Sequence, residues 1–244
     1  MKVFRRYSFL EIRPLEKMIL TLISFVVLFG IYLEIERPLY FSSVYTKEDG
    51  FVEWLGFTAL ILLSFLSFMR VFSLRKEKSL SFLLVTLIFS FIFFFGAGEE
   101  ISWGQRIFQI NSSSFFNQYN SQGETNIHNL VINDVGINKL VFGKILAVVI
   151  LIYFLVLPPL YSKFFFIRSK LNRFAIPLPR GYQIMTYLVF SIGVLLLQSA
   201  KRGELLEFLG CWSFLWIFYN PKNIDIFKKN DKISAALAKK GQYR

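Results

Sequence analysis

The sequence predicts an all-α protein: a polytopic transmembrane helix bundle of about six spans with both termini in the cytoplasm. Of its 244 residues, 55% are hydrophobic and 18% are aromatic, and the mean hydropathy is +0.50. This composition lies outside the range of ordinary soluble domains. Several apolar runs approach the roughly 20 residues that a helix needs to cross about 30 Å of hydrocarbon. Lys and Arg, finally, are abundant only in alternate loops, as in proteins that cross a membrane repeatedly.

Six apolar runs are the expected spans. They cover residues 18–35, 51–69, 79–98, 140–161, 182–200 and 204–219. We expect helices, because backbone groups in lipid must hydrogen-bond within their own segment and the sequence lacks the ten-residue alternation of a barrel. The first run should be a retained helix rather than a cleaved signal, since a charged stretch of 17 residues precedes it and no small-residue cleavage site follows it.

These spans predict one membrane domain, residues 1–220, followed by a basic cytoplasmic tail, residues 221–244. The tail is either a short amphipathic helix on the inner leaflet or a solvated, disordered end. The single cysteine, Cys211, lies in an apolar segment and excludes an intrachain disulfide or a CxxC metal site.

The positive charges predict the orientation. Of the 28 Lys and Arg residues, 21 fall in the N-terminus, the second and fourth loops and the C-terminus. Because cytoplasmic loops hold most of the Lys and Arg, we expect a multi-pass protein of the cell inner membrane with its first, third and fifth loops outside. The net charge of +12 then reflects orientation and attraction to membrane lipids, which excludes nucleic acid as a partner.

The negative charges gather on the opposite side. Eleven of the 16 Asp and Glu residues fall in or beside the outer loops, although carboxylates contribute little to topology. Three pairs lie at helix ends that should share one depth. They are Asp49 and Glu53, Glu99 and Glu100, and Glu204 and Glu207. We therefore predict that these carboxylates converge on one polar site.

The helix dipole accounts for some of these residues without any function. Asp49 and Glu204 lie at helix starts, where negative charge is favourable, whereas Glu53 and Glu207 lie deeper than a cap requires. The dipole cannot explain Glu99 and Glu100, because they close their helix, where negative charge is disfavoured. Two close carboxylates also raise each other's proton affinity, so one can stay neutral as an acid while the other is a base or ligand.

The third loop, residues 101–139, which should lie outside, is long enough to be functional or disordered. Its segment NQYNSQGETNIHNL is rich in side-chain donors and acceptors: Asn117, Gln118, Asn120, Gln122, Glu124, Asn126, His128 and Asn129. On a helix, Glu124 and His128 would share a face and could bind a metal or form an acid–base pair, the alternative being a surface pair. Trp54, Trp103 and Tyr119 could stack against a substrate, but we expect them to be interfacial anchors instead.

Three blocks, EDGFVEW, GAGEEISWGQRIF and NSQGETNIHNL, occur in this order between residues 47 and 130. In these blocks the chain resembles a family of uncharacterised bacterial polytopic membrane proteins, and GEEISWGQR is the most specific part. The resemblance implies a bacterial host and a site on the periplasmic side, but no particular activity. The chain departs from the membrane hydrolases of the alkaline ceramidase type, because its single histidine cannot supply a three-histidine zinc site.

These observations favour a hydrolase or transferase that acts on a lipid headgroup or a lipid-linked substrate. The expected catalytic residues are Glu99, Glu100, Glu124 and His128, and a divalent metal held by Glu100, Glu124 and His128 is one alternative. The expected substrate-binding residues are Glu53, Trp103, Gln105, Arg106, Asn126 and Glu207, with Arg106 pairing with an anionic headgroup. Ser102 is a further candidate nucleophile, although no histidine lies beside it in the sequence.

Two other functions stay open. A cation- or proton-coupled transporter could use the same carboxylates, but the inner halves of the spans contain few polar residues. The third alternative is an accessory protein whose polar loop docks a periplasmic partner. The sequence leaves the oligomeric state open.

Overall fold

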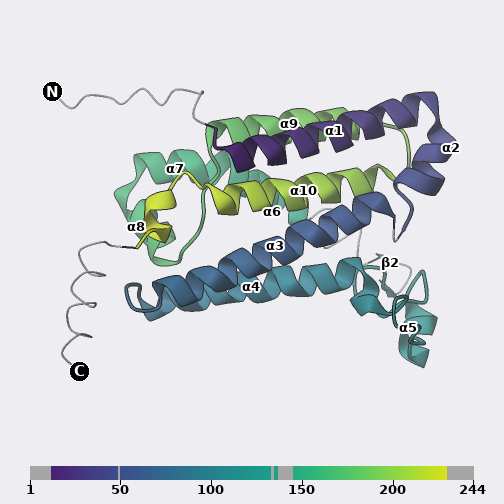
Figure 1. Ribbon diagram of the computed structural model, residues 1–244, viewed down its shortest axis with the longest axis horizontal. Coiled ribbons are helices and arrows are strands. Elements are labelled where there is room, and N and C mark those ends of the chain that lie inside the picture. Colours follow the sequence, from purple (N-terminus) through teal and green to yellow (C-terminus); the bar gives the residue numbers. More distant parts are fainter. Residues whose placement is uncertain (1–11, 49, 133–134, 137–144, 230–244) are drawn as a thin grey trace.

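The computed structural model describes residues 12–48, 50–132, 135–136 and 145–229 of the chain (Figure 1). Its regular secondary structure is helical apart from one antiparallel hairpin of two-residue strands, β1 (Val131–Ile132) and β2 (Val135–Gly136). Ile132 pairs with Val135 in this hairpin. The predicted all-α class is confirmed for the described residues.

Five long helices form most of the bundle: α1 (Pro14–Glu36), α3 (Phe51–Leu74), α4 (Leu80–Glu100), α9 (Gly181–Leu195) and α10 (Arg202–Tyr219). A sixth rod consists of α6 (Leu146–Leu151), the π-helical turn η4 (Ile152–Val156) and α7 (Leu157–Lys163). The shorter elements are α2 (Pro38–Tyr40), η1 (Phe41–Tyr45), η2 (Ser102–Gly104), α5 (Ser114–Tyr119), α8 (Phe165–Arg173) and η5 (Ile224–Phe227).

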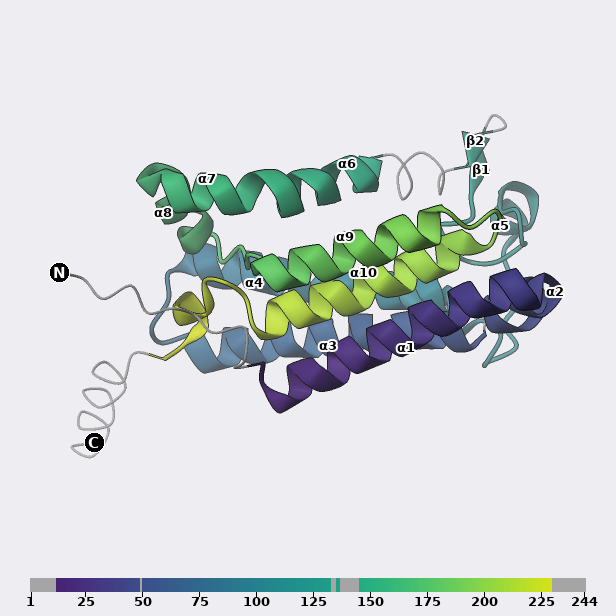
Figure 2. The ribbon, with the colours of Figure 1, turned by 90° about the horizontal axis from the view of Figure 1, so that it is seen from above.

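The long helices run side by side, and their connections gather at two ends (Figures 1 and 2). At one end, here called the basic end, α4 begins, α10 ends and α8 packs nearby. At the other, here called the loop end, α4 ends, α3 and α10 begin, and α2, α5 and the β hairpin lie. The loops are therefore grouped as the alternation of Lys and Arg predicts.

Helix α10 lies at the centre of the bundle. It packs against α1, α3 and α9, and its buried residues face several directions because the helix is apolar on most of its surface: Leu205, Phe208, Leu209, Trp212, Ser213, Leu215, Trp216, Ile217 and Phe218. The approach of α1 to α10 depends on Gly30, since a Cβ there would lie only 2.8 Å from Leu205 Cδ1. Helices α3 and α4 pack along each other, and both contact α10: α3 along its length, and α4 through Phe89 and Phe93, whose rings pack on Phe218.

In the part of the chain that the structure describes, four helices are long and apolar enough to cross a membrane: Pro14–Glu36, Phe51–Leu74, Leu80–Glu100 and Leu146–Lys163. They fit a membrane protein, and large apolar side chains are exposed along their outer faces, among them Phe25, Leu28, Phe65, Ile88 and Phe91. The other two predicted spans differ. Helix α9 has 15 residues, about 22 Å of rise, and α10 carries Arg202, Glu204 and Glu207 in its first two turns.

The predicted end of the fifth span needs correction, and the fourth span is not a regular helix. Helix α9 ends at Leu195 rather than at residue 200, because Arg202 Nη1 donates to the carbonyl oxygens of Leu195 and Leu197 at 3.1 and 2.6 Å. The fourth predicted span corresponds to the rod of α6, η4 and α7. It is interrupted by the π-helical turn Ile152–Val156, just before Pro158 and Pro159, which have no N–H to donate. The predicted start of that span, residues 140–144, lies outside the described residues.

The beginning of the predicted tail is folded onto the bundle. Lys222 N donates to Leu178 O at 2.7 Å, and Asn223, which is 5% exposed, bonds the backbone of both Leu178 and Ile176. A solvated, disordered start of the tail is therefore wrong for residues 221–227. Residues 230–244 lie outside the described residues.

Candidate functional site

The chain turns sharply where α4 closes. Helix α4 ends at Glu100, and the next residues, Ser102, Trp103 and Gly104, have φ values of 46°, 55° and 74°. Left-handed backbone is costly for residues other than glycine and often occurs at functional sites. Helix α4 ends here because three consecutive left-handed residues cannot extend a right-handed helix.

The turn folds Trp103 back over α4. A Cβ on Gly98 would lie 2.8 Å from the Trp103 ring, so only glycine leaves room for the indole there. The ring also contacts Phe95, with centroids 5.3 Å apart, and its Nε1 donates to Glu99 Oε1 at 2.9 Å. Gly98, the second glycine of GAGEE, thus has a packing role that the sequence analysis did not predict.

Glu99 anchors the polar loop to the end of α4. Besides Trp103, the backbone N–H groups of Ile127 and His128 donate to Glu99 Oε2 at 2.6 and 3.1 Å. Three N–H donors satisfy a carboxylate that is 6% exposed. Glu99 therefore positions the loop as a buried carboxylate with hydrogen-bond donors on both oxygens.

Glu124 is the centre of a second network, directly beside the first. Its Oε2 accepts from Ser102 Oγ at 2.5 Å and from Asn126 Nδ2 at 3.2 Å, and its Oε1 forms an ion pair with Arg106. Asn126 Nδ2 also donates to Ser102 Oγ at 2.9 Å. The structure thus brings a buried serine hydroxyl, a carboxylate and an amide together, and Glu124 is a hydrogen-bond partner of Ser102 that sequence reasoning did not identify.

The loop from residue 120 to residue 130 is closed rather than helical. Asn120 and Leu130 form an isolated antiparallel bridge, Asn120 Nδ2 donates to Asn126 Oδ1 at 2.9 Å, and Gly123 has φ +69°. The prediction that Glu124 and His128 share a helical face is wrong for this reason. A left-handed glycine and the Asn120 side chain organise the segment into turns instead.

Gln105 connects the two halves of the loop. Its Oε1 accepts from Thr125 N at 2.7 Å, and its Nε2 donates to Ser112 Oγ at 2.6 Å. These bonds hold the segment after the left-handed turn against the segment around Glu124. Gln105, predicted to bind substrate, is here a loop-positioning residue.

Glu100 faces away from this loop. Its carboxyl lies against α3, where a Cβ on Gly56 would be 3.5 Å from Glu100 Oε2. The charges of Glu53, Glu204 and Glu207 act on it, which places the four carboxyls together where α3, α4 and α10 meet. The predicted convergence therefore holds for Glu53, Glu100, Glu204 and Glu207, whereas Glu99 belongs to the loop network and Asp49 lies outside the described residues.

His128 lies between the loop and the first turn of α10. Burial is the main influence on its pKa and lowers it from 6.5, while the carboxylates of Glu99 and Glu48 oppose this shift and Lys201 adds to it. Lys201 itself donates to Glu48 Oε1 at 2.7 Å. His128 is accordingly neutral at neutral pH, and Glu48 and Lys201 are neighbours that sequence reasoning did not assign to it.

The predicted metal set is not gathered. Across residues 12–48, 50–132, 135–136 and 145–229, no three His, Cys, Asp or Glu side chains are placed to hold a metal ion. Glu124 is bonded to Arg106 and Ser102, while Glu100 belongs to the interhelical carboxyls. The ligand set Glu100, Glu124 and His128 is thus incorrect as a single centre, because two separate networks hold its members.

A further buried carboxylate lies at the basic end and was not predicted as a site. Glu16 is fully buried, and its oxygens accept from Tyr182 OH at 2.7 Å, Trp216 Nε1 at 2.8 Å and Asn220 Nδ2 at 2.8 Å. Arg13 N completes a capping interaction at 3.2 Å. The only sequence signal was an acid in the first turn of an apolar helix, which a helix cap already explains.

No protein-family model, curated protein or solved structure matches this chain. The geometry of its own residues must therefore carry any functional conclusion.

Proposed function

We propose that the loop end is the active site of a membrane hydrolase or transferase that acts on a lipid headgroup or a lipid-linked substrate. The main support for this proposal is the 2.5 Å hydrogen bond from Ser102 Oγ to Glu124 Oε2, with Ser102 itself in the left-handed turn after α4. A nucleophilic hydroxyl needs an adjacent base that is itself held in place. Arg106 and Asn126 hold Glu124 in this way.

In the proposed reaction, Ser102 Oγ attacks the carbonyl carbon or phosphorus of the substrate ester. Its proton passes to Glu124 Oε2 and is then delivered to the departing alcohol oxygen, so that the charges balance. Water or an acceptor alcohol subsequently releases the group from Ser102 by the reverse proton transfers. Asn126 Nδ2, 2.9 Å from Oγ, orients the hydroxyl before the attack.

The surroundings fit a substrate at a membrane surface. The Arg106 side chain is 43% exposed and can meet an anionic headgroup beside its ion pair with Glu124. Trp103 is 43% exposed and Phe108 is 71% exposed next to it, as expected of aromatic residues at headgroup depth. These residues support a headgroup rather than a fully soluble substrate.

The orientation is part of the same proposal. We place the loop end in the periplasm of a bacterium and the basic end in the cytoplasm, with α9 and α10 completing six spans of the inner membrane. The distribution of Lys and Arg between the two ends supports this orientation. The orientation can be tested by labelling single cysteines from outside intact cells. One variant is Ser121→Cys, on the exposed loop, and the other is Lys76→Cys, between α3 and α4. Only the first should react.

A serine-directed fluorophosphonate probe tests the chemistry without knowledge of the substrate. In membranes, the probe should label Ser102, as located by peptide mass spectrometry, and Ser102→Ala should abolish the label. Glu124→Gln should slow labelling at least tenfold, because the amide cannot accept the proton. The matched control is Ser121→Ala, at an exposed position of the same loop, which should leave labelling intact. An unlabelled Ser102 in folded protein would refute the assignment.

Proton-coupled transport is the second candidate, and the four interhelical carboxyls favour it. Glu53, Glu100, Glu204 and Glu207 lie together between three helices, and ionisable side chains within membrane helices often mark ion or proton pathways. Proton flux into liposomes that is lost in Glu100→Gln would support transport. Fluorophosphonate labelling that persists in Glu100→Gln, with no flux in the wild type, would favour the enzyme.

A further inference from the structure

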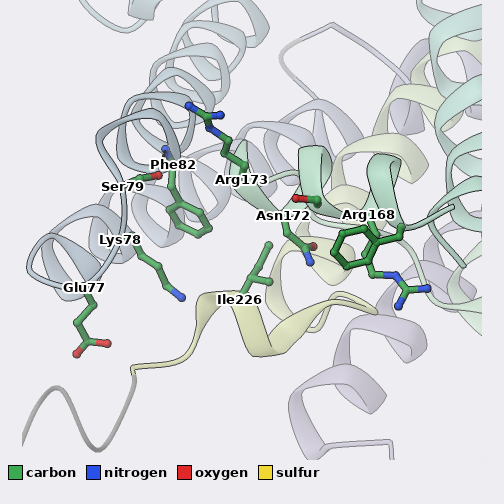
Figure 3. A pocket seen from close by; sticks show the side chains of 10 residues that line it. Glu77, Lys78, Ser79, Phe82, Arg168, Asn172, Arg173 and Ile226 are labelled. Atoms are coloured by element: carbon green, nitrogen blue, oxygen red, sulfur yellow. Dashed lines mark hydrogen bonds between the residues drawn. The ribbon is translucent and has the colours of Figure 1, made fainter.

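The basic end contains a cavity that the proposed function does not use. Its volume is about 460 Å³, and it lies between the start of α4, helix α8 and η5 (Figure 3). Ten residues line it: Glu77, Lys78, Ser79, Phe82, Phe165, Arg168, Ser169, Asn172, Arg173 and Ile226. Three cations and one carboxylate make this lining basic, in contrast to the carboxyl-rich loop end.

The cations line the cavity from two elements, and Lys78 and Arg173 extend in different directions (Figure 3), so a shared ligand draws both side chains inward. Figure 3 shows the Lys78 side chain extending toward Ile226, while Glu77 points away from it. Lys78 Nζ lies 5.6 Å from the centre of the Phe82 ring, an arrangement that leaves its donors available. Within the described chain, neither Lys78 nor Arg173 forms an ion pair with a carboxylate.

Arg168 is fixed in place by the preceding helix. Its Nε and Nη2 donate to the carbonyl oxygens of Tyr161 and Ser162 at 3.2 and 2.9 Å. The guanidinium therefore satisfies the end of α7 and contributes its charge to the rim of the cavity. Lys78 and Arg173 are the cations that remain available to a ligand.

The start of α4 adds a second attraction for an anion. Ser79 is the N-cap of this 21-residue helix, and its Oγ accepts from Phe82 N at 3.4 Å. The first N–H groups of a helix lack intrahelical acceptors and carry partial positive charge, which favours phosphate. A cavity, two available cations and a helix start thus coincide.

The neighbouring helix indicates that this anion belongs to a membrane component. Phe165 is 80% exposed and Phe166 is 68% exposed on α8, directly beside Arg168. Aromatic residues followed by cations in a short helix are typical of segments that lie at the membrane interface. Phe165 also lines the cavity, so apolar chains could continue from a bound headgroup along this helix.

We propose that this cavity binds the phosphate of an anionic phospholipid, such as phosphatidylglycerol or cardiolipin, in the leaflet at the basic end. Lys78, Arg173 and the first turn of α4 bind the phosphate, and Phe165 contacts the acyl chain. Basic pockets between membrane helices are suited to such headgroups. This proposal is independent of the chemistry proposed for Ser102.

Native mass spectrometry of the detergent-purified full chain tests it. Phosphatidylglycerol should bind in preference to phosphatidylcholine, and the double variant Lys78→Gln/Arg173→Gln should weaken binding at least tenfold. The matched control, Lys76→Gln/Lys170→Gln, removes the same charge from exposed positions outside the cavity and should change binding less than threefold. An equal loss in both double variants would show non-specific attraction and overturn the site.

Two further arms separate the sources of phosphate and guard against misfolding. Inorganic phosphate at 10-fold excess over the lipid should not displace it, and displacement would assign the cavity to a soluble phosphate instead. Arg173→Lys, which retains the charge, should keep more binding than Arg173→Gln. If the two variants fold equally well but bind equally weakly, the proposed phosphate contact is wrong.

Discussion

At the basic end, the carboxylate of Glu16 accepts hydrogen bonds from Tyr182, Trp216 and Asn220. The loop end differs, because it contains two kinds of carboxyl group. Some, such as Glu99, accept hydrogen bonds from N–H groups, whereas those around Glu100 lie next to one another. Glu16 and Glu99 each have N–H or O–H donors for both oxygens. Glu100 and Glu207 instead lie among other carboxyls, those of Glu53 and Glu204.

This difference separates structural carboxylates from candidate functional ones. A buried anion with a full set of donors stabilises one arrangement of the chain, and removing it leaves several donors unsatisfied. Carboxyls that face one another instead respond to protons or cations. Glu124 lies between these extremes, because it is bonded on both oxygens and yet holds the hydroxyl of Ser102.

The largest expected effect is at the basic end. Glu16→Ala should lower the free energy of unfolding by about 3–5 kcal/mol, because Tyr182, Trp216 and Asn220 lose a buried acceptor. Denaturant titration in detergent, followed by tryptophan fluorescence, measures this change. Glu36→Ala, at an exposed position of the same helix, is the control and should stay within about 0.5 kcal/mol. Similar losses in both variants would contradict the structural role of Glu16.

At the loop end, Glu99→Ala should loosen the polar loop without unfolding the bundle. The amides of Ile127 and His128 lose their acceptor, so their hydrogen exchange should accelerate about 10- to 100-fold, equivalent to about 1.4–3 kcal/mol. Exchange mass spectrometry of the peptide containing residues 120–132 reports this change. Glu100→Gln should leave the same amides protected, and faster exchange there would show that the two glutamates are not separated as described.

A smaller effect is expected where Trp103 packs on α4. Gly98→Ala should destabilise the turn by about 1–3 kcal/mol, since the new Cβ would lie 2.8 Å from the indole. Gly96→Ala is the matched control on the same helix, because its Cβ would meet Leu60 at an ordinary 3.5 Å. The control should be neutral or up to about 1 kcal/mol more stable. Thermal unfolding of both variants, with Trp103 emission as a local probe, distinguishes the positions.

The smallest effect is the dependence of the loop on pH. Burial lowers the pKa of His128 from 6.5, so the unfolded loop binds a proton more readily than the folded loop does. The stabilisation is therefore complete above pH 6.5 and declines as the pH falls through 6.5 toward the lower folded value. Loop hydrogen exchange, corrected for the intrinsic rate, should be faster at pH 5.5 than at pH 7.5. His128→Gln should remove this dependence, and its persistence would assign it to another group.

Several features of the site could be predicted from the sequence. The apolar runs identified the helices, and the positions of the acidic pairs at run ends indicated that Glu53, Glu100 and Glu207 would meet. Glu99 and His128 were both predicted to be catalytic, but the hydrogen bond between them runs through the backbone N–H of His128 and does not depend on the imidazole. The metal set and the helical pair of Glu124 and His128 were wrong, because spacing along the chain cannot reveal left-handed turns.

The sequence by itself determined the helical class, the apolar character of the spans and the separation of basic and acidic residues, because these properties depend on composition and local periodicity. Only the tertiary structure decided that Glu99 and Glu100 point into different networks, that Glu124 bonds Ser102, and that Glu16 is buried. The physical reason is distance along the chain. Asn220 donates to Glu16 across 204 positions, and hydrogen bonds of that kind follow from how helices pack rather than from any local pattern.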